Sequence, residues 1–286
     1  MRLLTSRLSA KRRSRLAGPF VLLFGLLVTG GFYAVFAPAS AESSASSADD
    51  IAKGRALFEV GCASCHGLNA QGIETKNGGQ YGPPLVGVGA AAVDFQVGTG
   101  RMPATQPGAQ IAAKRQVYTE EEIRQLGAFV QSLGPGPAVP SPDKYSPDAI
   151  PEDQREEAIV RGGLFFRTNC TACHNFAASG GALPGGKYAP NLRGVSAKHI
   201  YEAMLTGPQQ MPVFSDQVLK PEEKRDVIAY LESIETMPEY GGAQLGSVGP
   251  VAEGTYVWII GIATMVGFAI WIASHTARSA KRGTKA

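Results

Sequence analysis

Cys62-Ala63-Ser64-Cys65-His66 recurs as Cys170-Thr171-Ala172-Cys173-His174, and these two pentapeptides contain all four cysteines of the chain. Each thiol of such a pair can add to one vinyl group of a porphyrin, and the adjacent histidine then faces the iron. A structural disulfide, a thioredoxin-like redox pair and half of a zinc site also use Cys-x-x-Cys, but none of them requires the histidine. The doubled motif therefore predicts two covalently attached haem c groups, held by Cys62, Cys65, Cys170 and Cys173, with His66 and His174 as iron ligands.

The residues around the two pentapeptides repeat as well. Five positions match at a constant offset of 108, namely Gly54, Phe58, Cys62, Cys65 and His66 against Gly162, Phe166, Cys170, Cys173 and His174. Further along, segment 81–88 aligns with segment 188–195, and Met102-Pro103 aligns with Met211-Pro212. The chain therefore contains two copies of one small domain.

Met102 and Met211 follow their histidines by 36 and 37 residues, which is enough chain to cross a haem and return on its open face. As a sixth ligand, a thioether favours reduced iron and raises the reduction potential relative to bis-histidine ligation. Core filling is the ordinary role of a methionine, but repetition at equivalent places favours ligation. In the second half Met204, Met237 and His199 are rivals. Met237 falls after the last helix of the repeat, and we expect His199 to be a solvated helix residue, so Met102 and Met211 are the predicted axial ligands.

A helix is predicted at the end of each repeat. Thr119 to Glu122 has the pattern of a capping box with acids in the first turn. The counterpart in the second half begins at Pro221, a residue suited to the first helical turn. Both segments carry apolar residues on one face, namely Ile123, Leu126, Val130 and Leu133 in the first and Val227, Ile228, Leu231 and Ile234 in the second.

Helices are also predicted just before each haem motif. Residues 50–60 follow the caps Asp49 and Asp50, and residues 152–168 follow Pro151. No run alternates with period two for long enough to indicate a sheet, so the predicted class is all-α. Each half has fewer than about 100 residues, so we expect the haem to supply much of the buried surface.

The segment 135–151 between the halves is rich in proline, with Pro135, Pro137, Pro140, Pro142 and Pro147. Such a segment cannot sustain a helix and tends towards semi-rigid extension, which marks a domain boundary. A simple spacer and a rigid connector that sets the distance between two haems are both compatible with this composition.

Residues 255–274 are predicted to form a transmembrane helix. The stretch 256–273 has no charged residue and has aromatic residues at both ends, and a basic tail at 275–286 follows it. A buried helix of a soluble protein is the alternative. The tail is expected in the cytoplasm, and residues 239–254 form a glycine-rich tether between this helix and the second domain.

Residues 1–41 are a second hydrophobic segment, in which basic residues precede an uncharged stretch from Leu16 to Ala41. It can be a signal peptide cleaved after Ala39-Ser40-Ala41 or a retained membrane helix. The apolar part from Phe20 to Phe36 exceeds the usual signal-peptide core of roughly 7–15 residues, which favours retention. Either outcome puts the haem domains outside the cytoplasm, which agrees with attachment of haem c after export.

The formal net charge of +3 and the pI near 8.6 come from the two ends of the chain. Ten of the 27 Lys and Arg residues lie before Leu16 or after Ala273, and all 24 acids lie between, so the exported part has 17 bases and a net charge of −7. No basic groove interleaved with aromatic residues occurs, so no nucleic-acid partner is expected. A mildly acidic surface suits docking to a positively charged redox protein, although solubility is its ordinary explanation.

Each half, 50–134 and 152–238, resembles the mono-haem cytochrome c fold, with a first helix, Cys-x-x-Cys-His, a Gly-Pro-type loop, an axial Met-Pro loop and a closing helix. In that family the carbonyl of the loop proline accepts a hydrogen bond from the iron-binding imidazole, a role that maps to Pro83 and Pro190. Turn formation alone is the alternative role of these prolines.

The chain as a whole resembles the dihaem cytochrome cc subunit of the actinobacterial cytochrome bc complex. The resemblance implies an electron-transfer subunit of a proton-translocating menaquinol:cytochrome c reductase, with no catalytic acid or base of its own. Its partners would be cytochrome b, the Rieske iron–sulfur protein as electron donor, and a cytochrome c oxidase as acceptor in a supercomplex at the cell membrane.

Two other functions remain open. A dihaem subunit of a periplasmic dehydrogenase or oxidase carries the same pentapeptides. A dihaem peroxidase keeps or gains an open coordination site at one iron, and it is disfavoured because both halves offer a sixth ligand and the chain has a C-terminal anchor.

Overall fold

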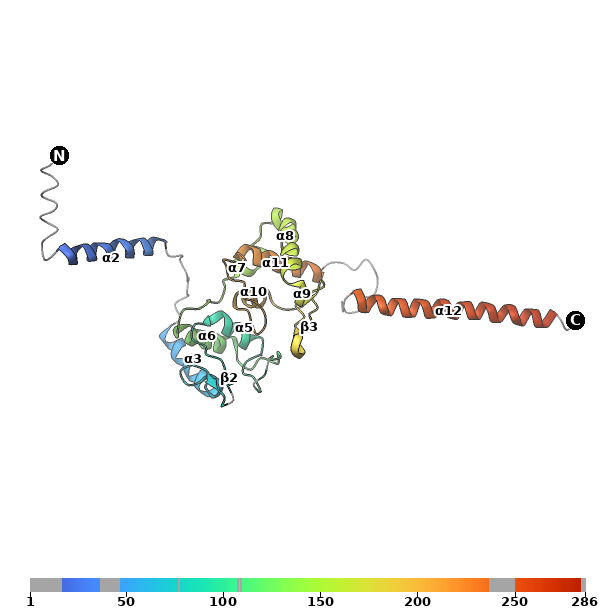
Figure 1. Cartoon of the computed structure of the whole chain (residues 1–286), viewed down its shortest axis with the longest axis horizontal. Coiled ribbons are helices and arrows are strands. Elements are labelled where there is room, and N and C mark those ends of the chain that lie inside the picture. Colours follow the sequence, from blue (N-terminus) through green and yellow to red (C-terminus); the bar gives the residue numbers. More distant parts are fainter. Residues whose placement is uncertain are drawn as a thin grey trace, which may run out of the picture. The chain divides into compact units, whose positions relative to one another are not determined.

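The computed structural model describes residues 17–36, 47–76, 78–106, 108, 110–236 and 250–283. The chain divides into two compact units, Met1–Ala45 and Ser46–Ala286. The first unit contains helix α2 (Ala17–Phe36). The second contains both repeats and the C-terminal helix α12 (Pro250–Gly283) (Figure 1).

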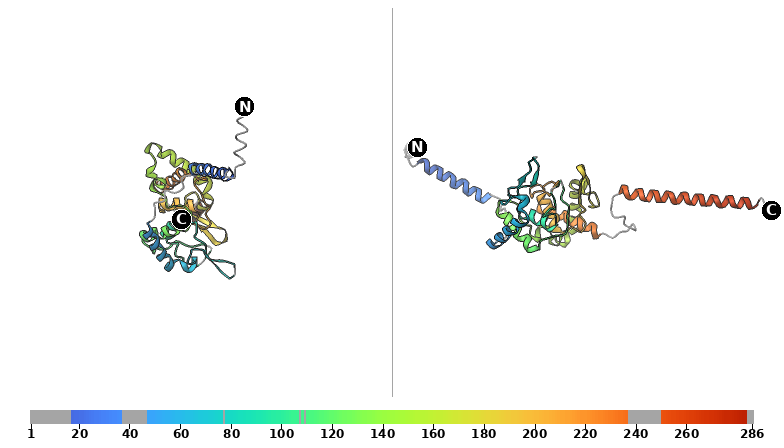
Figure 2. Two further views of the ribbon diagram at one scale, coloured as in Figure 1. Left: turned by 90° about the vertical axis from the view of Figure 1, so that its left-hand side faces the viewer. Right: turned by 90° about the horizontal axis from the view of Figure 1, so that it is seen from below.

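The same sequence of elements occurs in each half of the second unit. In the first half it consists of α3 (Ala48–Gly61), α4 (Ala63–His66), β1 (Ile73–Glu74), β2 (Gln80–Gly82), α5 (Gly89–Gly98) and α6 (Glu120–Ser132). In the second half it consists of α8 (Arg155–Asn169), α9 (Thr171–His174), β3 (Gly181–Leu183), β4 (Lys187–Ala189), α10 (Ala197–Thr206) and α11 (Pro221–Thr236). Figure 1 and the left view of Figure 2 show the halves as two adjoining groups of helices.

The structure is mainly helical, and it differs from the all-α prediction by two small antiparallel pairs, β1–β2 and β3–β4. Strands of two or three residues are too short to show a period-two pattern, which is why the sequence did not reveal them. Helix α5 was not predicted either, and of α10 only the helical placement of His199 was expected. Helix α5 begins at Gly89 without a side-chain cap, so it lacks the usual signal of a helix start.

The predicted helix starts are confirmed in two places, at Thr119 for α6 and at Pro221 for α11, and corrected in two. Helix α3 is capped by Ser47, whose hydroxyl accepts a hydrogen bond from the Asp50 amide, whereas Asp49 and Asp50 lie in the first turn and are not caps. The segment after Pro151 begins as a single 3-10 turn, Glu152–Gln154, before α8. The capping box of α6 is present, because Thr119 and Glu122 each bind the backbone amide of the other.

Replacing Thr119 with alanine is expected to lower the free energy of unfolding by about 1 kcal/mol, because the Glu122 amide at the start of α6 loses its acceptor. Urea unfolding of the full chain, followed by circular dichroism, measures this difference. Thr105→Ala changes an exposed threonine outside the helices and is the matched control, with an expected effect below about 0.5 kcal/mol. Equal losses in both variants would contradict a role for the cap.

The first and last helices of each half cross where a glycine removes the side chain. A Cβ atom on Gly54 of α3 would lie 1.9 Å from the carbonyl oxygen of Gln125 in α6. A Cβ atom on Gly162 of α8 would lie 1.9 Å from the carbonyl oxygen of Asp226 in α11. This close approach explains why the repeat places glycine at both positions.

One helical turn after each glycine, two aromatic rings pack against each other between the crossing helices. The ring centroids of Phe58 and Phe129 lie 5.2 Å apart, and those of Phe166 and Tyr230 lie 5.6 Å apart. Phe58 and Phe166 are both buried. They anchor the two hydrophobic cores, one in each half.

Replacing Gly54 with alanine is expected to lower the free energy of unfolding by about 2 kcal/mol, because α3 must move away from α6 to admit the methyl group. Gly127→Ala in α6 is the matched control, since its Cβ would meet atoms of Ala90 at 3.5 Å or more, which is ordinary van der Waals contact. Urea unfolding of both variants tests the difference. If the Gly54 variant had the same free energy of unfolding as the wild type, the crossing of α3 and α6 would have room for a methyl group.

The segment 135–151 packs on both halves. The carbonyl of Pro137 accepts a hydrogen bond from the Ala91 amide at 3.0 Å in the first half. On the other side, Ile150 is buried against Ala158 and Ala229 in the second half. These contacts favour the rigid connector over the simple spacer.

This segment also contains helical turns where none was expected. The single turn α7 (Pro142–Tyr145) and the 3-10 turn Pro147–Ala149 both start with a proline. Proline is tolerated at the first position of a helix because its missing N–H has no intrahelical partner there. The expectation of no helix is therefore wrong for single turns.

The two halves contact each other directly through their backbones and side chains. Gln110 donates to the carbonyl of Tyr188 at 2.6 Å and accepts from the amide of the same residue at 2.8 Å. Gln209 forms the same two-way contact with Ile111, at 2.9 and 3.2 Å. Helices α5 and α10 also pack against each other. These contacts join the halves within one unit.

Among the described residues, one helix is long and apolar enough to cross a membrane, the part of α12 from Gly254 to His275. Its side chains are exposed along this length. The apolar part of α2, Gly18–Phe32, is shorter. The predicted cleavage site at residues 39–41, Met237 and residues 239–249 of the tether lie outside the described residues.

Candidate functional site

Each Cys-x-x-Cys-His pentapeptide forms a tight junction between two helices. The Cys62 amide donates to the carbonyl of Phe58 at the end of α3, and the His66 amide donates to the carbonyl of Cys62 at 3.0 Å. The same two bonds recur in the second half, where the His174 amide donates to the carbonyl of Cys170 at 2.9 Å. The two thiols and the imidazole of each motif are therefore held within one local turn.

The state of the four cysteines bears on the alternative sites that Cys-x-x-Cys also permits. All four are free thiols, so neither pair is a disulfide. Burial, helped by the second thiol of each pair, raises the pKa of Cys62 and of Cys170 to about 11, which is opposite to the lowered pKa of a redox-active cysteine. Within the described part of the chain, no cluster with metal-binding geometry includes a cysteine.

The two histidines are oriented by backbone carbonyls. Nδ1 of His66 lies 2.8 Å from the carbonyl oxygen of Pro83, and Nδ1 of His174 lies 3.0 Å from that of Pro190. An imidazole that donates through Nδ1 keeps the lone pair of Nε2 for a metal. Both imidazoles are buried, and burial lowers the pKa of His174 although its contact with Pro190 acts in the opposite direction. The neutral imidazole is the form that binds iron.

A small hairpin brings each proline to its histidine. Gly82 ends β2 directly against the motif, because a Cβ there would lie 2.4 Å from the carbonyl of Cys65. In the second half Gly181, at the start of β3, approaches the motif, since a Cβ there would lie 3.0 Å from the carbonyl of Cys173. The amides of Leu85 and Leu192 then donate at 2.8 Å to the carbonyls of Ala70 and Ala178, so both loops close in the same way.

Large apolar side chains beside the motifs remain exposed. Leu68 and Phe176, each two residues after a motif histidine, are 66% and 67% exposed. Val213, two residues after Met211, is 56% exposed. Exposed apolar side chains of this size, close in the chain to a motif histidine or to a predicted methionine ligand, fit a bound porphyrin that would cover them.

The predicted axial methionines lie on loops that follow equivalent helices. Met102 follows α5 and is half-buried against the first core, with its amide donating to the carbonyl of Gln96 at 2.8 Å. The ammonium of Lys114 donates to the carbonyls of Gly100 and Pro103 and so holds this loop from both sides.

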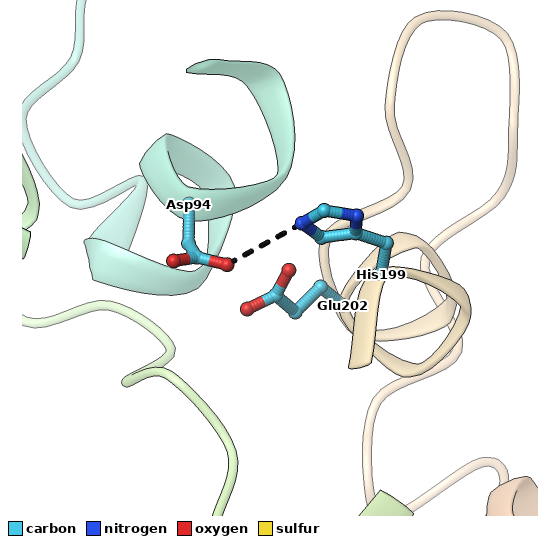
Figure 3. A group of neighbouring side chains, drawn as sticks. All are labelled: Asp94, His199 and Glu202. Atoms are coloured by element: carbon cyan, nitrogen blue, oxygen red, sulfur yellow. Dashed lines mark ion pairs between the residues drawn. The ribbon is translucent and has the colours of Figure 1, made fainter. Parts of the chain in front are cut away.

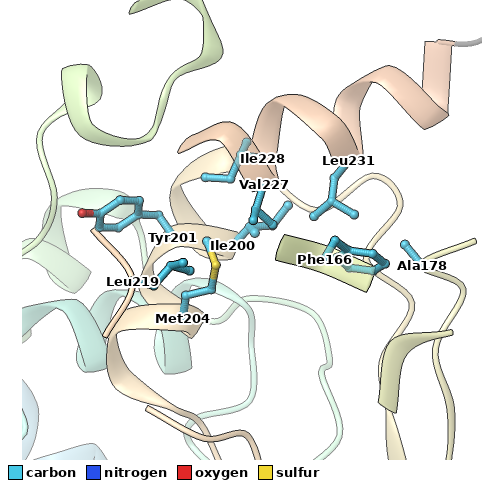
Figure 4. Packing of buried hydrophobic residues seen from close by; sticks show 9 residues of the cluster. All are labelled: Phe166, Ala178, Ile200, Tyr201, Met204, Leu219, Val227, Ile228 and Leu231. Atoms are coloured by element: carbon cyan, nitrogen blue, oxygen red, sulfur yellow. The ribbon is translucent and has the colours of Figure 1, made fainter. Parts of the chain in front are cut away.

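In the second half, Gly207 ends α10 in the left-handed conformation, with φ of +60°. Met211 then lies half-buried against the second core. Its rival Met204 is 3% exposed and lies within that core, beside Tyr201 and Leu219 (Figure 4). Met204 therefore has the core-filling role, and the assignment of Met102 and Met211 to the iron stays a prediction.

His199 is not the solvated helix residue that the sequence indicated. It lies on α10 with its side chain 20% exposed, and its ring meets the edge of Phe95 of α5 at a centroid distance of 6.2 Å. Together with Asp94 and Glu202 it forms a cluster between the halves (Figure 3). The spacing of His199 and Glu202 could have suggested a shared helix face, but no sequence signal pointed to Asp94.

Both halves match families of known proteins. Residues 51–134 match the family described as Cytochrome c, and residues 157–231 match the family described as Cytochrome C oxidase, cbb3-type, subunit III.

Curated relatives are similar over nearly the whole chain. The "Cytochrome bc1 complex cytochrome c subunit" of Mycobacterium tuberculosis is 43% identical over 276 residues, which are 95% of each chain. The protein of the same name from Corynebacterium efficiens is 41% identical over 280 residues, covering 93% of this chain and 91% of the relative. The "Cbb3-type cytochrome c oxidase subunit FixP" of Sinorhizobium medicae is 27% identical over 148 residues, covering 50% of this chain and 44% of the relative.

Proposed function

This chain belongs to the family of cytochrome c subunits of the cytochrome bc1 complex, and from that membership we propose that it carries electrons through two covalently bound haem c groups to a cytochrome c oxidase. The observation that carries the proposal is the contact between a motif histidine and a proline carbonyl, which occurs in both halves. A repeated preoriented imidazole beside two free thiols is what two haem sites require.

The residues of each half have distinct roles in this proposal. Bound haem c supplies one-electron redox chemistry at iron. Cys62 and Cys65 would attach the first group, and Pro83 keeps the His66 ring in place. His66 and Met102 would hold the iron of this group, so that no substrate would need to bind the metal and no catalytic acid or base would be required.

The second half repeats this arrangement. Cys170 and Cys173 would attach the second group, Pro190 orients His174, and His174 and Met211 would hold its iron. The contacts of Gln110 and Gln209 between the halves support electron transfer from one half to the other, because they restrain the separation of the two sites.

Within the complex, this chain takes electrons from the Rieske iron–sulfur protein beside cytochrome b and passes them to the oxidase in a supercomplex. Proton translocation by the reductase would then take place outside this chain. The apolar stretch Gly254–His275 anchors the chain, with the haem domains on the extracytoplasmic side and the basic tail in the cytoplasm.

A subunit of a cbb3-type oxidase is the second candidate function. The family match over residues 157–231 and the similarity to the FixP subunit favour it. However, that similarity covers 50% of this chain, whereas the bc1 relatives cover up to 95%. The oxidase assignment is therefore the weaker one.

Purification of the full chain through a C-terminal tag in mild detergent tests the proposal. We expect cytochrome b, a Rieske protein and oxidase subunits to co-purify, with haem staining at the position of this chain. Recovery of an oxidase or a dehydrogenase without cytochrome b and the Rieske protein would contradict the proposed electron path.

A further inference from the structure

A cluster of three potential ligands lies between the halves, apart from both haem motifs. Asp94 belongs to α5, and His199 and Glu202 belong to α10. One ligand atom from each residue lies within 4.8 Å of the other two. His199 and Glu202 are three positions apart on one helix, so their side chains share a face, and Figure 3 shows that this face is turned towards Asp94.

Glu202 is the group of the cluster whose burial is least offset by hydrogen bonds. The residue is fully buried, and neither carboxylate oxygen has a hydrogen-bond partner among the described residues. Burial, the negative charge of Asp94 and the side-chain contact with Asp94, which favours a protonated Glu202, raise the pKa of Glu202 to about 10. A buried carboxyl group without a donor is costly, and a proton or a bound cation can relieve that cost.

Asp94 is the anionic partner of the cluster. Burial alone would raise its pKa, but the side chains of His199, Lys198 and Glu202 together outweigh burial and lower the pKa to about 2. Oδ2 of Asp94 lies 2.8 Å from Nζ of Lys198 and 3.7 Å from Nε2 of His199. The carboxylate of Glu120, at the start of α6, adds negative potential at both Glu202 and Lys198. Three carboxyl groups thus face one ammonium group and one imidazole.

We propose that Asp94, His199 and Glu202 bind one divalent cation of the zinc class, which joins α5 of the first half to α10 of the second. One imidazole nitrogen with two carboxylate oxygens suits zinc, whereas calcium and magnesium prefer oxygen ligands alone. Two ligands of a tetrahedral zinc ion lie about 3.3 Å apart, given metal–ligand bonds of about 2.0 Å, so the 3.7 Å between Asp94 and His199 needs little adjustment. Water would supply the fourth ligand.

The ammonium group of Lys198 would compete with a cation for this site. This group binds the same oxygen of Asp94 that a cation would use, so it must withdraw when the cation binds. The Lys198 side chain is 26% exposed, which gives it a route into solvent. Because the site draws on both halves, the bound cation would hold them at a fixed separation.

The direct test is zinc binding by the full chain with its haems attached, in detergent. After equilibration with zinc chloride and gel filtration, mass spectrometry of the metal content should find about one zinc per wild-type chain and less than about a tenth as much in Glu202→Gln. Glu156→Gln changes an exposed glutamate of α8 and is the matched control, which should keep the zinc. An unchanged haem spectrum shows that each variant is folded.

Two further measurements do not depend on the folding of the Glu202 variant. X-ray absorption at the zinc edge of the wild-type chain should show nitrogen and oxygen at about 2.0–2.1 Å and no sulfur. Lys198→Met should bind zinc roughly fivefold more tightly in competition with a chromophoric chelator, since the competing ammonium is gone. Absence of zinc from the wild type, equal zinc in Glu202→Gln, a sulfur ligand, or weaker binding by Lys198→Met would each overturn the proposal.

Discussion

The double substitution Cys62→Ala and Cys65→Ala should leave a chain with one covalently bound haem instead of two. Both thioether bonds of the first motif depend on these thiols, and no other cysteine exists in the first half to replace them. The haem content per chain, measured by the pyridine haemochrome spectrum, should therefore fall by half. Haem staining on a denaturing gel should persist, because the second motif still holds its haem covalently.

The matched control is the double substitution Cys170→Ala and Cys173→Ala. It should also halve the haem content per chain, because it removes the other haem. The variant without any cysteine should show no staining. Two haems per chain in either double variant would contradict the assignment of one haem to each motif.

Replacing Met102 or Met211 with histidine should lower the reduction potential of one haem by an amount on the order of 200 mV, within the range of about 0.8 V that axial ligands span. The thioether stabilises reduced iron, whereas a second imidazole favours the oxidised state. Each loop serves its own half, so each variant should shift one potential and leave the other in place. A spectroscopic redox titration of the full chain resolves the two.

Met204→Leu is the control for this experiment, because Met204 lies in the second core and the substitution nearly conserves its volume. Both potentials should stay unchanged in that variant. If the reduction potentials stayed unchanged in both the Met102 and the Met211 variants, neither residue would be an iron ligand.

Structural features that depend on residues close together in the sequence could be predicted well. The capping box of α6 is a contact between residues three positions apart, and the sequence shows both partners. The start of α11 at Pro221 follows from the fixed φ of proline. Gly54 and Gly162 stood out through the repeat, although the reason for them, a helix crossing without room for a Cβ atom, appears in the packing.

Predictions were wrong where the surroundings of a residue are formed by segments that are far away in the sequence. His199 has the ordinary sequence context of an exposed helix residue, yet α5 of the other half covers it. The strands β1 to β4 are too short to have a pattern of their own, and they form because the loops around each motif must close.

The sequence by itself determined the doubled haem-attachment motif, the repeat that carries it and the apolar C-terminal segment, because each depends on the order of residues that are close in the chain. Only the tertiary structure decided that Pro83 and Pro190 meet the histidines, that Met204 fills a core, and that the halves share an interface. Asp94 and His199 are 105 positions apart, and their distance depends on how α5 packs against α10. Burial and partnership of charged groups are properties of that packing, and spacing along the chain does not encode them.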